Sequence, residues 1–533
     1  MDLKQGFLSI VLHAHLPYVR HPEYDSFFEE IWLFEAITEC YIPLINVFDR
    51  LSEDGVDYRL TISLSPTLIL MLRDELLQKR YLNYIDSRIE LAEKEIVRTK
   101  SQKEYQRLAR LYRRLFIRVR KTYQHYHCDL LQAFKKHHAL GQLELITTAA
   151  THGFLPLLNV SEMAVRNQIK SGIDTFESNL GFAPSGFWLP ECGFYSGLEQ
   201  MLAEAGVSYF FIDTHGILDA DAQAKNNVYA PLDCGNGVMA FARDPESSHQ
   251  VWSAQEGYPG DVNYQEYYSD IGFELDLETI APYILDGKTR INTGIKYHRV
   301  TEDNQFKEVY DPAKAKNKAE KDAKDFITKR LEQINKLDQW MDRTPIIVSP
   351  YDAELFGHWW AEGPHWLENV LRLASEPQCE IKLTNCREYL TRQKDHQISM
   401  PSASTWGEEG YSSYWVNEEN DWVYPFLHKI AEQMEQLAID FTDIKVFPIQ
   451  KRALNQAFRS VLLAQASDWP FILKSGTTTE YANKKIKDYL ARFNYLHESI
   501  RSNKIDERYL LALETMDNVF PEIDFRDYKP ITL

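Results

Sequence analysis

The chain has 533 residues, of which 44% are hydrophobic and 26% charged, so it can bury a large core, and its length allows about two to four domains. Its formal net charge of -19 argues against nucleic acid as the main partner, because binding to phosphates requires a basic face. Its six scattered cysteines lack a CxxC spacing and no apolar run approaches 18 residues, so we expect a reduced, cytoplasmic protein without a membrane partner.

The first predicted strand, residues 7–12, is a continuous apolar run that ends in His13-Ala14-His15. Because side chains alternate along a strand, His13 and His15 share one face. Enzymes built on parallel strands place their chemistry at the carboxyl ends of those strands. The two histidines therefore indicate the mouth of a barrel, although the same spacing is also typical of a metal site, which stays open as an alternative.

A second strand is predicted at residues 58–64, followed by a highly charged helical stretch at 67–139. Between residues 73 and 136 this stretch holds 17 Lys and Arg against 8 Asp and Glu, in an otherwise acidic chain. A solvated helical hairpin inserted between two strands explains such a charge run, and a docking surface is the alternative.

Three further strands, at residues 143–149, 186–189 and 207–212, each end in polar residues. His152 follows the first, Glu191 follows Trp188 in the second, and Asp213 and His215 follow the third. A single histidine at a strand end is usually structural. Four histidines together with acids at the ends of successive strands indicate one polar site at a common rim.

The remaining strands are predicted at residues 238–241, 346–348 and 381–383, and the first of them leads to Arg243. A long segment rich in Tyr, Gly and Pro, 245–276, then suggests a substrate wall, and 311–340 is a surface helix. The strand at 346–348 delivers Asp352, which is followed by Trp359 and Trp360.

Glu191 and Asp352 thus occupy matching positions, each at a strand end beside tryptophan. Two such carboxylates are typical of a sugar-cleaving site, in which one attacks or stabilises and the other transfers the proton. The alternative is that each acid caps the helix that follows it. The repetition of the pattern favours the catalytic interpretation.

The alternation of strands and helices ends near residue 400. An aromatic loop containing Trp406 and Trp415 follows, then helices at 426–441, 451–466 and 479–502, with a sharp break at Asp468-Trp469. We therefore predict a catalytic barrel at residues 1–400, interrupted by a helical insertion at 67–139, and a C-terminal helical domain at 401–533 that completes the substrate cleft.

With these residues in view, the chain resembles family-57 glycoside hydrolases over nearly its full length, and most closely their 1,4-alpha-glucan branching enzymes with a C-terminal helical domain. Five motifs in order carry the resemblance: 13–17 (HAHLP), 150–156 (ATHGFLP), 188–193 (WLPECG), 351–359 (YDAELFGHW) and 405–408 (TWGE). Five motifs in the same order are a much stronger signal than any one of them.

The resemblance implies an α/β fold, an incomplete (β/α)7 barrel of the TIM type, with no metal, no cofactor and a retaining mechanism. Glu191 would be the nucleophile and Asp352 the general acid/base. The residues expected to bind substrate are His13, His15, His152, Trp188, Asp213, His215, Arg243, Trp359, Trp360, Trp406, Trp415, Asp468 and Trp469. The expected partner is an alpha-1,4-glucan such as amylose or glycogen, and the expected oligomeric state is a monomer.

The acceptor decides which reaction follows. A glucan 6-hydroxyl gives an alpha-1,6 branch and water gives hydrolysis, so a glucan branching enzyme is the main interpretation. An alpha-amylase or a 4-alpha-glucanotransferase on the same scaffold is the alternative, and a metal-dependent hydrolase using His13, His15, His152 and Asp213 is a third. The resemblance also implies a flexible loop with a tyrosine at its tip, and the corresponding stretch, 231–237, contains no tyrosine.

Overall fold

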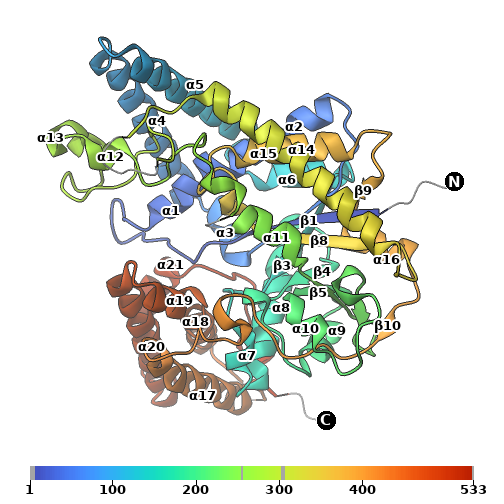
Figure 1. Cartoon of the computed structure of the whole chain (residues 1–533). Coiled ribbons are helices and arrows are strands. Elements are labelled where there is room, and N and C mark those ends of the chain that lie inside the picture. The colour runs from blue at the N-terminus through green and yellow to red at the C-terminus, as the bar shows by residue number, and fades with distance from the viewer. Residues whose placement is uncertain (1–5, 254–255, 302–306, 444, 531–533) are drawn as a thin grey trace.

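The computed structural model describes residues 6–253, 256–301, 307–443 and 445–530. A curled, mostly parallel sheet surrounded by helices forms the centre, and a group of helices from the last part of the chain packs beside it (Figure 1). This arrangement confirms the predicted fold class, an incomplete (β/α)7 barrel with a helical insertion and a C-terminal helical region.

Seven parallel strands form the barrel wall in the order β7-β5-β4-β3-β2-β1-β8. They are β1 (Gly6–Ala14), β2 (Leu60–Leu64), β3 (Leu143–Thr148), β4 (Gly186–Trp188), β5 (Tyr209–Ile212), β7 (Met239–Ala242) and β8 (Ile346–Asp352). The two edges of the wall meet at a backbone hydrogen bond of 2.9 Å from the Asp244 amide, after β7, to the Val348 carbonyl in β8. The carboxyl ends of the strands therefore surround one rim.

Three short strands extend this wall. β9 (Ile381–Leu383) is the strand predicted at 381–383, and it pairs parallel with the start of β1, whereas β6 (Leu232–Asp233) and β10 (Gln397–Ile398) have no counterpart among the predicted strands. Each of these two is only two residues long, and so short a segment has no recognisable hydrophobic alternation.

The stretch 231–237 contains β6 and the turn into β7, which run antiparallel to each other. The Cys234 amide bonds to the Val238 carbonyl at 3.0 Å, and Met239 pairs with Tyr209 at the start of β5. The turn therefore lies at the amino ends of the barrel strands, opposite the rim that carries Glu191 and Asp352. The assignment of 231–237 to the flexible loop that the resemblance implies is therefore wrong as far as a loop near the catalytic rim is meant. β6 reverses the direction of the chain and places this stretch at the opposite end of the barrel.

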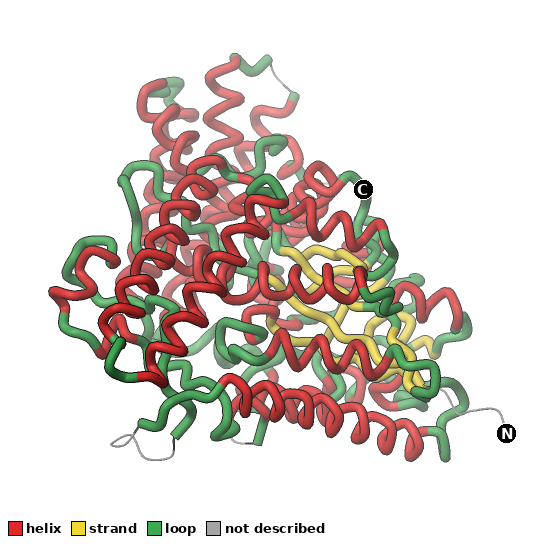
Figure 2. The backbone as a smooth tube through the Cα atoms, turned by 90° about the horizontal axis from the view of Figure 1, so that it is seen from above, coloured by secondary structure: helices red, strands yellow, loops and turns green. Residues whose placement is uncertain are grey.

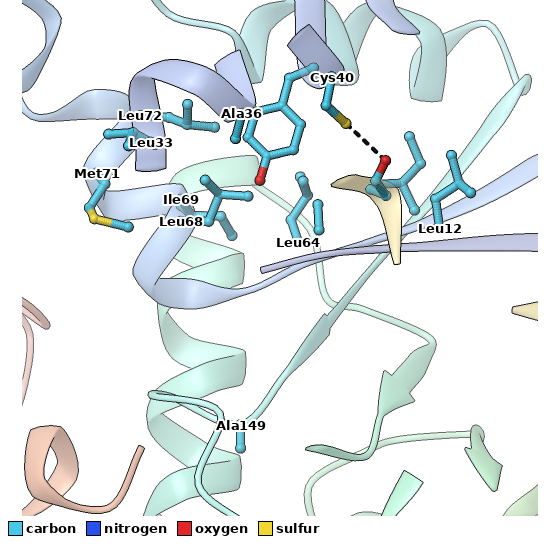
Figure 3. Close-up of a cluster of buried hydrophobic side chains, with 14 of the residues drawn as sticks. Leu12, Leu33, Ala36, Cys40, Leu64, Leu68, Ile69, Met71, Leu72 and Ala149 are labelled. Atoms are coloured by element: carbon cyan, nitrogen blue, oxygen red, sulfur yellow. Dashed lines mark hydrogen bonds between the residues drawn. The ribbon is translucent and has the colours of Figure 1, made fainter. Parts of the chain in front are cut away.

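Helices cover the outside of the wall, as the view from above shows (Figure 2). α8 (Glu162–Leu180) packs on β3, and α15 (Gly363–Ala374) packs on β9, on α2 (Ile42–Glu53) and on α14 (Pro312–Leu337). Between the wall and these helices lies an apolar core, in which Leu12 and Leu64 of the strands meet Cys40 and the side chains of α3 (Pro66–Arg73) (Figure 3).

The helical insertion consists of α3, the long pair α4 (Glu75–Arg98) and α5 (Lys103–His125), and α6 (Leu131–Ala139). α4 and α5 pack against each other and hold the segment that follows α11 (Pro245–Trp252). Tyr112 of α5 donates to the Lys296 carbonyl at 2.6 Å, and Arg88 of α4 donates to the Tyr283 carbonyl at 2.6 Å. Within the predicted substrate wall, 245–276, Gln265 Nε2 donates to the Tyr112 hydroxyl at 2.6 Å, so the insertion holds both this segment and the residues that follow it.

The C-terminal helices are α17 (Tyr424–Thr442), α18 (Pro448–Ala464), α19 (Asp468–Ser475), α20 (Thr479–Arg501) and α21 (Glu507–Met516). They join the barrel through the loop after β3: Gly153 and Ala466 form an isolated β-bridge, and the Ser467 amide bonds to the His152 carbonyl at 3.1 Å. These contacts place the start of α19 over the catalytic rim. The domain boundary at residue 400 stays a prediction.

One continuous helical run, residues 30–53, is long and apolar enough to cross a membrane by length and composition alone, contrary to the expectation from the sequence. It comprises α1 (Glu30–Glu35), the π-helical turn η1 (Ala36–Tyr41) and α2. Of its most apolar window 78% is buried inside the protein, as expected for a core helix of the barrel.

The backbone of α8 approaches the wall closely at Gly172. A methyl group at this position would lie 2.3 Å from the Thr148 carbonyl oxygen at the end of β3. We expect Gly172→Ala to lower the free energy of unfolding by about 3 kcal/mol, because overpacking against backbone forces the helix outward. Urea unfolding measures this loss.

The matched control is Gly181→Ala at the end of the same helix, where φ is 89° and the added methyl has no neighbour within 4 Å. Gly181→Ala should lower the free energy of unfolding only by the cost of placing alanine in a left-handed backbone conformation, about 1 kcal/mol. Equal losses for the two variants would contradict the proposed steric origin.

Candidate active site

Glu191 lies just beyond β4, in the 3-10 turn η2 (Pro190–Cys192). Its φ of 61° is unusual for a residue other than glycine, and backbone strain of this kind clusters at functional sites. Its carboxylate accepts hydrogen bonds from Trp406 Nε1 at 2.8 Å and from Ser467 Oγ at 3.0 Å. Two segments distant in sequence therefore fix this single side chain.

Three histidines from two strand ends form the floor beside Glu191. His13 Nε2 lies 3.0 Å from His152 Nε2, and His152 Nδ1 lies 2.8 Å from Ser467 Oγ. The His13 ring also stacks on Trp188, with the centroids 4.6 Å apart. Burial lowers the pKa of both His13 and His152 well below the ordinary value, so these two rings are neutral at pH 7.

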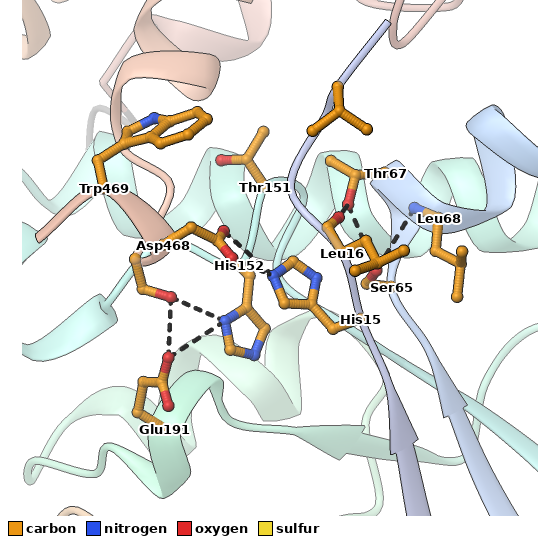
Figure 4. Close-up of polar contacts among 12 residues, drawn as sticks. His15, Leu16, Ser65, Thr67, Leu68, Thr151, His152, Glu191, Asp468 and Trp469 are labelled. Carbon is orange, nitrogen blue, oxygen red and sulfur yellow. Dashed lines mark hydrogen bonds and ion pairs between the residues drawn. The ribbon is translucent and has the colours of Figure 1, made fainter. Parts of the chain in front are cut away.

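His15 differs from the other two because it has an acidic partner. Its Nε2 lies 3.1 Å from an Asp468 carboxylate oxygen at the start of α19 (Figure 4). Burial opposes the charged ring, but the Asp468 charge and hydrogen bond outweigh it and raise the pKa of His15. The floor thus places one imidazole that favours the charged form beside two neutral ones.

Asp352 ends β8, where it pairs in register with His13 of β1. It directly precedes the 3-10 turn η6 (Ala353–Leu355), in the capping position, yet its side chain makes no capping bond there. The two bonds to the Glu191 carboxylate come from the side chains of Trp406 and Ser467 and not from the amides of a following helix. By contrast, Asp213 and Asp244 do cap the helices that follow them. The capping alternative therefore accounts for the acids after β5 and β7 and not for the pair.

Burial raises the pKa of Glu191 to about 7, although its bonds from Trp406 and Ser467 lower it, and the Asp352 charge raises it further. Burial likewise raises the pKa of Asp352 to about 6, against the lowering effect of His15 and Arg243. Since the Asp352 charge acts on Glu191, these values belong to the pair and not to either residue alone. Glu191 has two donors that favour its ionised form, whereas none bonds the Asp352 carboxyl in the described residues.

Four of the six tryptophans predicted to bind substrate are interior residues, namely Trp188, Trp360, Trp415 and Trp469. Trp415 stacks on Phe154, and the Trp469 indole donates to the Leu463 carbonyl at 2.9 Å. Contrary to the prediction, burial leaves these four side chains almost no surface with which to contact a sugar. Trp406 is partly exposed, and Trp359 is 50% exposed.

The remaining polar residues of the predicted site, Asp213, His215 and Arg243, bond to other groups of the protein. Arg243 donates to Asp213 at 2.6 Å, and His215 Nε2 lies 2.9 Å from the Gly410 carbonyl of the loop that carries Trp406. The rim of β5 and β7 is thus connected to the loop above Glu191. Contacts of these three side chains with a glucan stay a prediction.

The metal alternative requires free nitrogens on the histidines. Both ring nitrogens of His13 and of His152 lie within hydrogen-bond distance of protein groups, and Asp213 pairs with Arg243. Within residues 6–530, apart from the undescribed gaps, no group of three His, Cys, Asp or Glu residues has the arrangement of a metal site. The absence of a resident metal stays a prediction to be tested on the protein.

Three residues near the pair were not predicted from the sequence: Ser63, which bonds His13; Ser467; and Glu354, whose carboxylate accepts from Tyr41. Glu354 lies inside the fourth motif, two residues beyond Asp352, and this place in the motif could have indicated that it belongs to the site. Ser467 had only the weak signal of a polar residue before Asp468.

Comparison with known proteins identifies the class. The profile of glycosyl hydrolase family 57 matches residues 9–401, and the profile described as "1,4-alpha-glucan branching enzyme, C-terminal" matches residues 426–528. The chain therefore belongs to glycosyl hydrolase family 57, and it is a glucan-active enzyme of that family, a glycoside hydrolase or transglycosylase.

Three relatives cover almost the whole chain. A 1,4-alpha-glucan branching enzyme of Thermococcus kodakarensis is 33% identical over 97% of this chain and 77% of its own length. The crystal structure of the alpha-amylase AmyC from Thermotoga maritima is 43% identical, with a TM-score of 0.93 over 99% of this chain and 100% of that one. The branching enzyme of Pyrococcus horikoshii is 32% identical, with a TM-score of 0.88 over 99% and 97%.

The bond from Ser467 to Glu191 generates a prediction about pH. Ser467→Ala removes a donor to the ionised carboxylate and so raises the pKa of Glu191. The acidic limb of kcat/KM should then move to higher pH by about one unit, because a hydrogen bond to a charged group contributes about 1.5 kcal/mol. The pH dependence of kcat/KM on amylose measures this shift.

Ser475→Ala is the matched control, since Ser475 ends the same helix and bonds the Ile472 carbonyl. It should leave the pH profile unchanged. An acidic limb that stays in place in Ser467→Ala would mean that the serine only supports the fold.

Proposed function

We propose that this enzyme is a retaining 1,4-alpha-glucan branching enzyme with Glu191 as nucleophile and Asp352 as general acid/base. The observation that carries the proposal is that the C-terminal region, which matches the branching-enzyme profile, supplies Ser467 to the Glu191 carboxylate and Asp468 to His15. The helical region thus takes part in the catalytic rim. The substrate is an alpha-1,4-glucan, as expected for the family.

The chemistry follows from the two carboxyls. Glu191 attacks the anomeric carbon and the bond to the glycosidic oxygen breaks, while Asp352 gives that oxygen its proton. The result is a covalent glucosyl enzyme and a free chain end. Asp352 then takes the proton of a 6-hydroxyl on an acceptor chain, that oxygen attacks the anomeric carbon, and Glu191 is released.

Transfer requires that water reach the glucosyl enzyme less readily than a second chain. The Trp406 indole donates a hydrogen bond to the Glu191 carboxylate, and the Gly410 carbonyl of the same loop lies within hydrogen-bond distance of His215 Nε2. These contacts support a role for the loop in excluding water. They also give Trp406 an effect on the nucleophile itself, so Trp406→Ala should lower hydrolysis as well as transfer.

A second candidate is an alpha-amylase, because AmyC is more similar in sequence than either branching enzyme, at 43% against 33% and 32% identity. The two candidates differ only in the acceptor. They share the carboxylate pair, the fold and the C-terminal helices.

The deciding measurement is to incubate the protein with amylose and to count alpha-1,6 linkages by proton NMR alongside new reducing ends. A branching enzyme should form several alpha-1,6 linkages for each reducing end. Reducing ends without new branches would overturn the branching proposal and establish the amylase.

The nucleophile assignment predicts the effect of Glu191→Gln. Both amylose reactions should fall at least about a thousandfold, which corresponds to about 4 kcal/mol of barrier, because an amide cannot attack the anomeric carbon. The unfolding midpoint should stay close to that of the parent protein. Glu204→Gln on α9 (Leu198–Glu204), where the carboxylate is exposed, is the control and should keep full activity.

Appreciable turnover by Glu191→Gln would refute the assignment. A strong chelator, combined with metal analysis of the purified protein, tests the metal-dependent alternative, and activity should be unaffected. A cytoplasmic location and a monomeric state belong to the proposal as expectations from the sequence.

A further inference from the structure

The segment that follows Asp352 carries a half-exposed indole, that of Trp359. The Trp359 amide donates to the Glu354 carbonyl at 3.2 Å, so the backbone turns back and brings the indole close to the beginning of the segment. An indole face is a large flat apolar surface, on which the apolar face of a sugar ring can stack. Such a surface binds best when it is held in one orientation beforehand, since ordering it on binding costs entropy.

A chain of contacts connects this indole to the π-helical turn η1. Trp359 packs on Tyr267, with the ring centroids 4.4 Å apart, and against His358 at 5.2 Å. The Tyr267 hydroxyl lies 3.3 Å from His358 Nε2, and His358 Nδ1 lies 2.6 Å from the Glu39 carboxylate. The chain therefore runs from an acid of η1 through His358 and Tyr267 to the indole.

The bond between Glu39 and His358 fixes the imidazole. Both side chains are only 15% exposed, so the bond is largely shielded from solvent. Burial raises the pKa of Glu39, but the hydrogen bond and charge of His358, together with nearby positive charges, outweigh burial and lower it. An ionised carboxylate only accepts, so Nδ1 donates, and Nε2 faces a Tyr267 hydroxyl that can both donate and accept.

The backbones of η1 and of this segment also touch. Gly357 has a φ of 112°, and a methyl group there would lie 1.8 Å from the Glu39 carbonyl oxygen. Only glycine permits both this conformation and this approach. His358 follows Gly357 directly, so its position relative to Glu39 is fixed by the backbone as well as by the side chains.

We propose that Glu39 and His358 are positioning residues that hold the Tyr267 ring and the Trp359 indole as a preformed platform for one glucose unit of the substrate. The inference rests on the proposed function, since it takes the substrate to be an alpha-1,4-glucan. His358 meets both rings at nearly right angles and so holds them together from the side. A platform held in advance strengthens binding of the chain and leaves the chemical step unchanged.

The test measures kcat and KM on amylose for Tyr267→Phe and Trp359→Ala. Tyr267→Phe keeps the stacked ring and removes only the hydroxyl that faces His358, so KM should rise about fivefold, the effect of one hydrogen bond. Trp359→Ala removes the platform, and KM should rise by at least about tenfold. In both variants kcat should change by less than about twofold, because the platform contacts the bound substrate and the transition state equally.

The double variant Tyr267→Phe/Trp359→Ala shows whether the hydroxyl acts through the indole. Its KM should equal that of Trp359→Ala, because the stack that the hydroxyl holds is already lost. A further rise in KM, as large as that of Tyr267→Phe alone, would overturn the positioning role and mean that the hydroxyl contacts the sugar itself.

Glu39→Gln keeps an oxygen that accepts from His358 and should keep the KM of the parent protein, whereas Glu39→Ala should raise KM as Tyr267→Phe does. If Glu39→Ala fails to fold, Tyr267→Phe decides. An unchanged KM in Tyr267→Phe, or a lower kcat at constant KM, would overturn the proposal.

Tyr126→Phe is the matched control. It also removes a tyrosine hydroxyl that bonds a side chain, that of Asp49 at 2.7 Å, at the carboxyl end of α5. It should leave both kcat and KM unchanged. A rise in KM equal to that of Tyr267→Phe would mean that the loss of any such hydroxyl has this effect, and it would refute the platform.

Binding to Glu191→Gln separates this inference from the proposed function, because that variant should bind a glucan without cleaving it. In this background Tyr267→Phe should raise the Kd for maltoheptaose, measured by calorimetry, about fivefold. An unchanged Kd would refute the inference alone and leave the carboxylate mechanism in place. Turnover by Glu191→Gln would refute the proposed mechanism, while the KM values would still decide the inference. A protein that binds no maltoheptaose would refute both.

Discussion

The burial of two carboxylates at one rim is the constraint on which the rest of the structure depends. A buried charge is tolerated only where donors or opposite charges compensate it. The donors to Glu191 come from Trp406 and Ser467, more than 200 residues further along the chain. Both bonds lower the pKa of Glu191 and so favour its ionised form, which makes the barrel and the C-terminal region a single catalytic unit.

The histidine floor extends the same principle. Among the described residues His13 has no carboxylate partner and His152 Nδ1 lies 3.6 Å from Glu191 Oε1, and burial lowers the pKa of both rings, whereas Asp468 raises the pKa of His15. The floor thus holds one imidazole that favours the charged form, and its charge acts on the acid that has to release a proton. A second charged ring would draw the proton from Asp352 more strongly and weaken it as a general acid.

The barrel strands could be predicted because buried parallel strands are continuous apolar runs that end in polar residues. For the same reason Glu191, Asp352 and the three histidines could be placed at one rim. The environment of each tryptophan could not be predicted, since an indole beside a strand end packs inward or outward according to long-range contacts. The position of 231–237 at the amino ends of the strands could not be predicted either. It depends on β6, a strand of two residues that reverses the chain and leaves no recognisable pattern in the sequence.

The helical insertion connects this chemistry to the choice of acceptor. Its helices hold the segment that carries Tyr267 and Lys296, and Tyr267 packs on the half-exposed Trp359 with ring centroids 4.4 Å apart. The Lys296 ammonium lies over the Tyr267 ring, 4.1 Å from its centroid. We expect a wall fixed in this way to limit the entry of water into the cleft. In the proposed branching reaction, the ratio of transfer to hydrolysis would then depend on how firmly α4 and α5 hold this wall, at a distance from the carboxylates that break the bond.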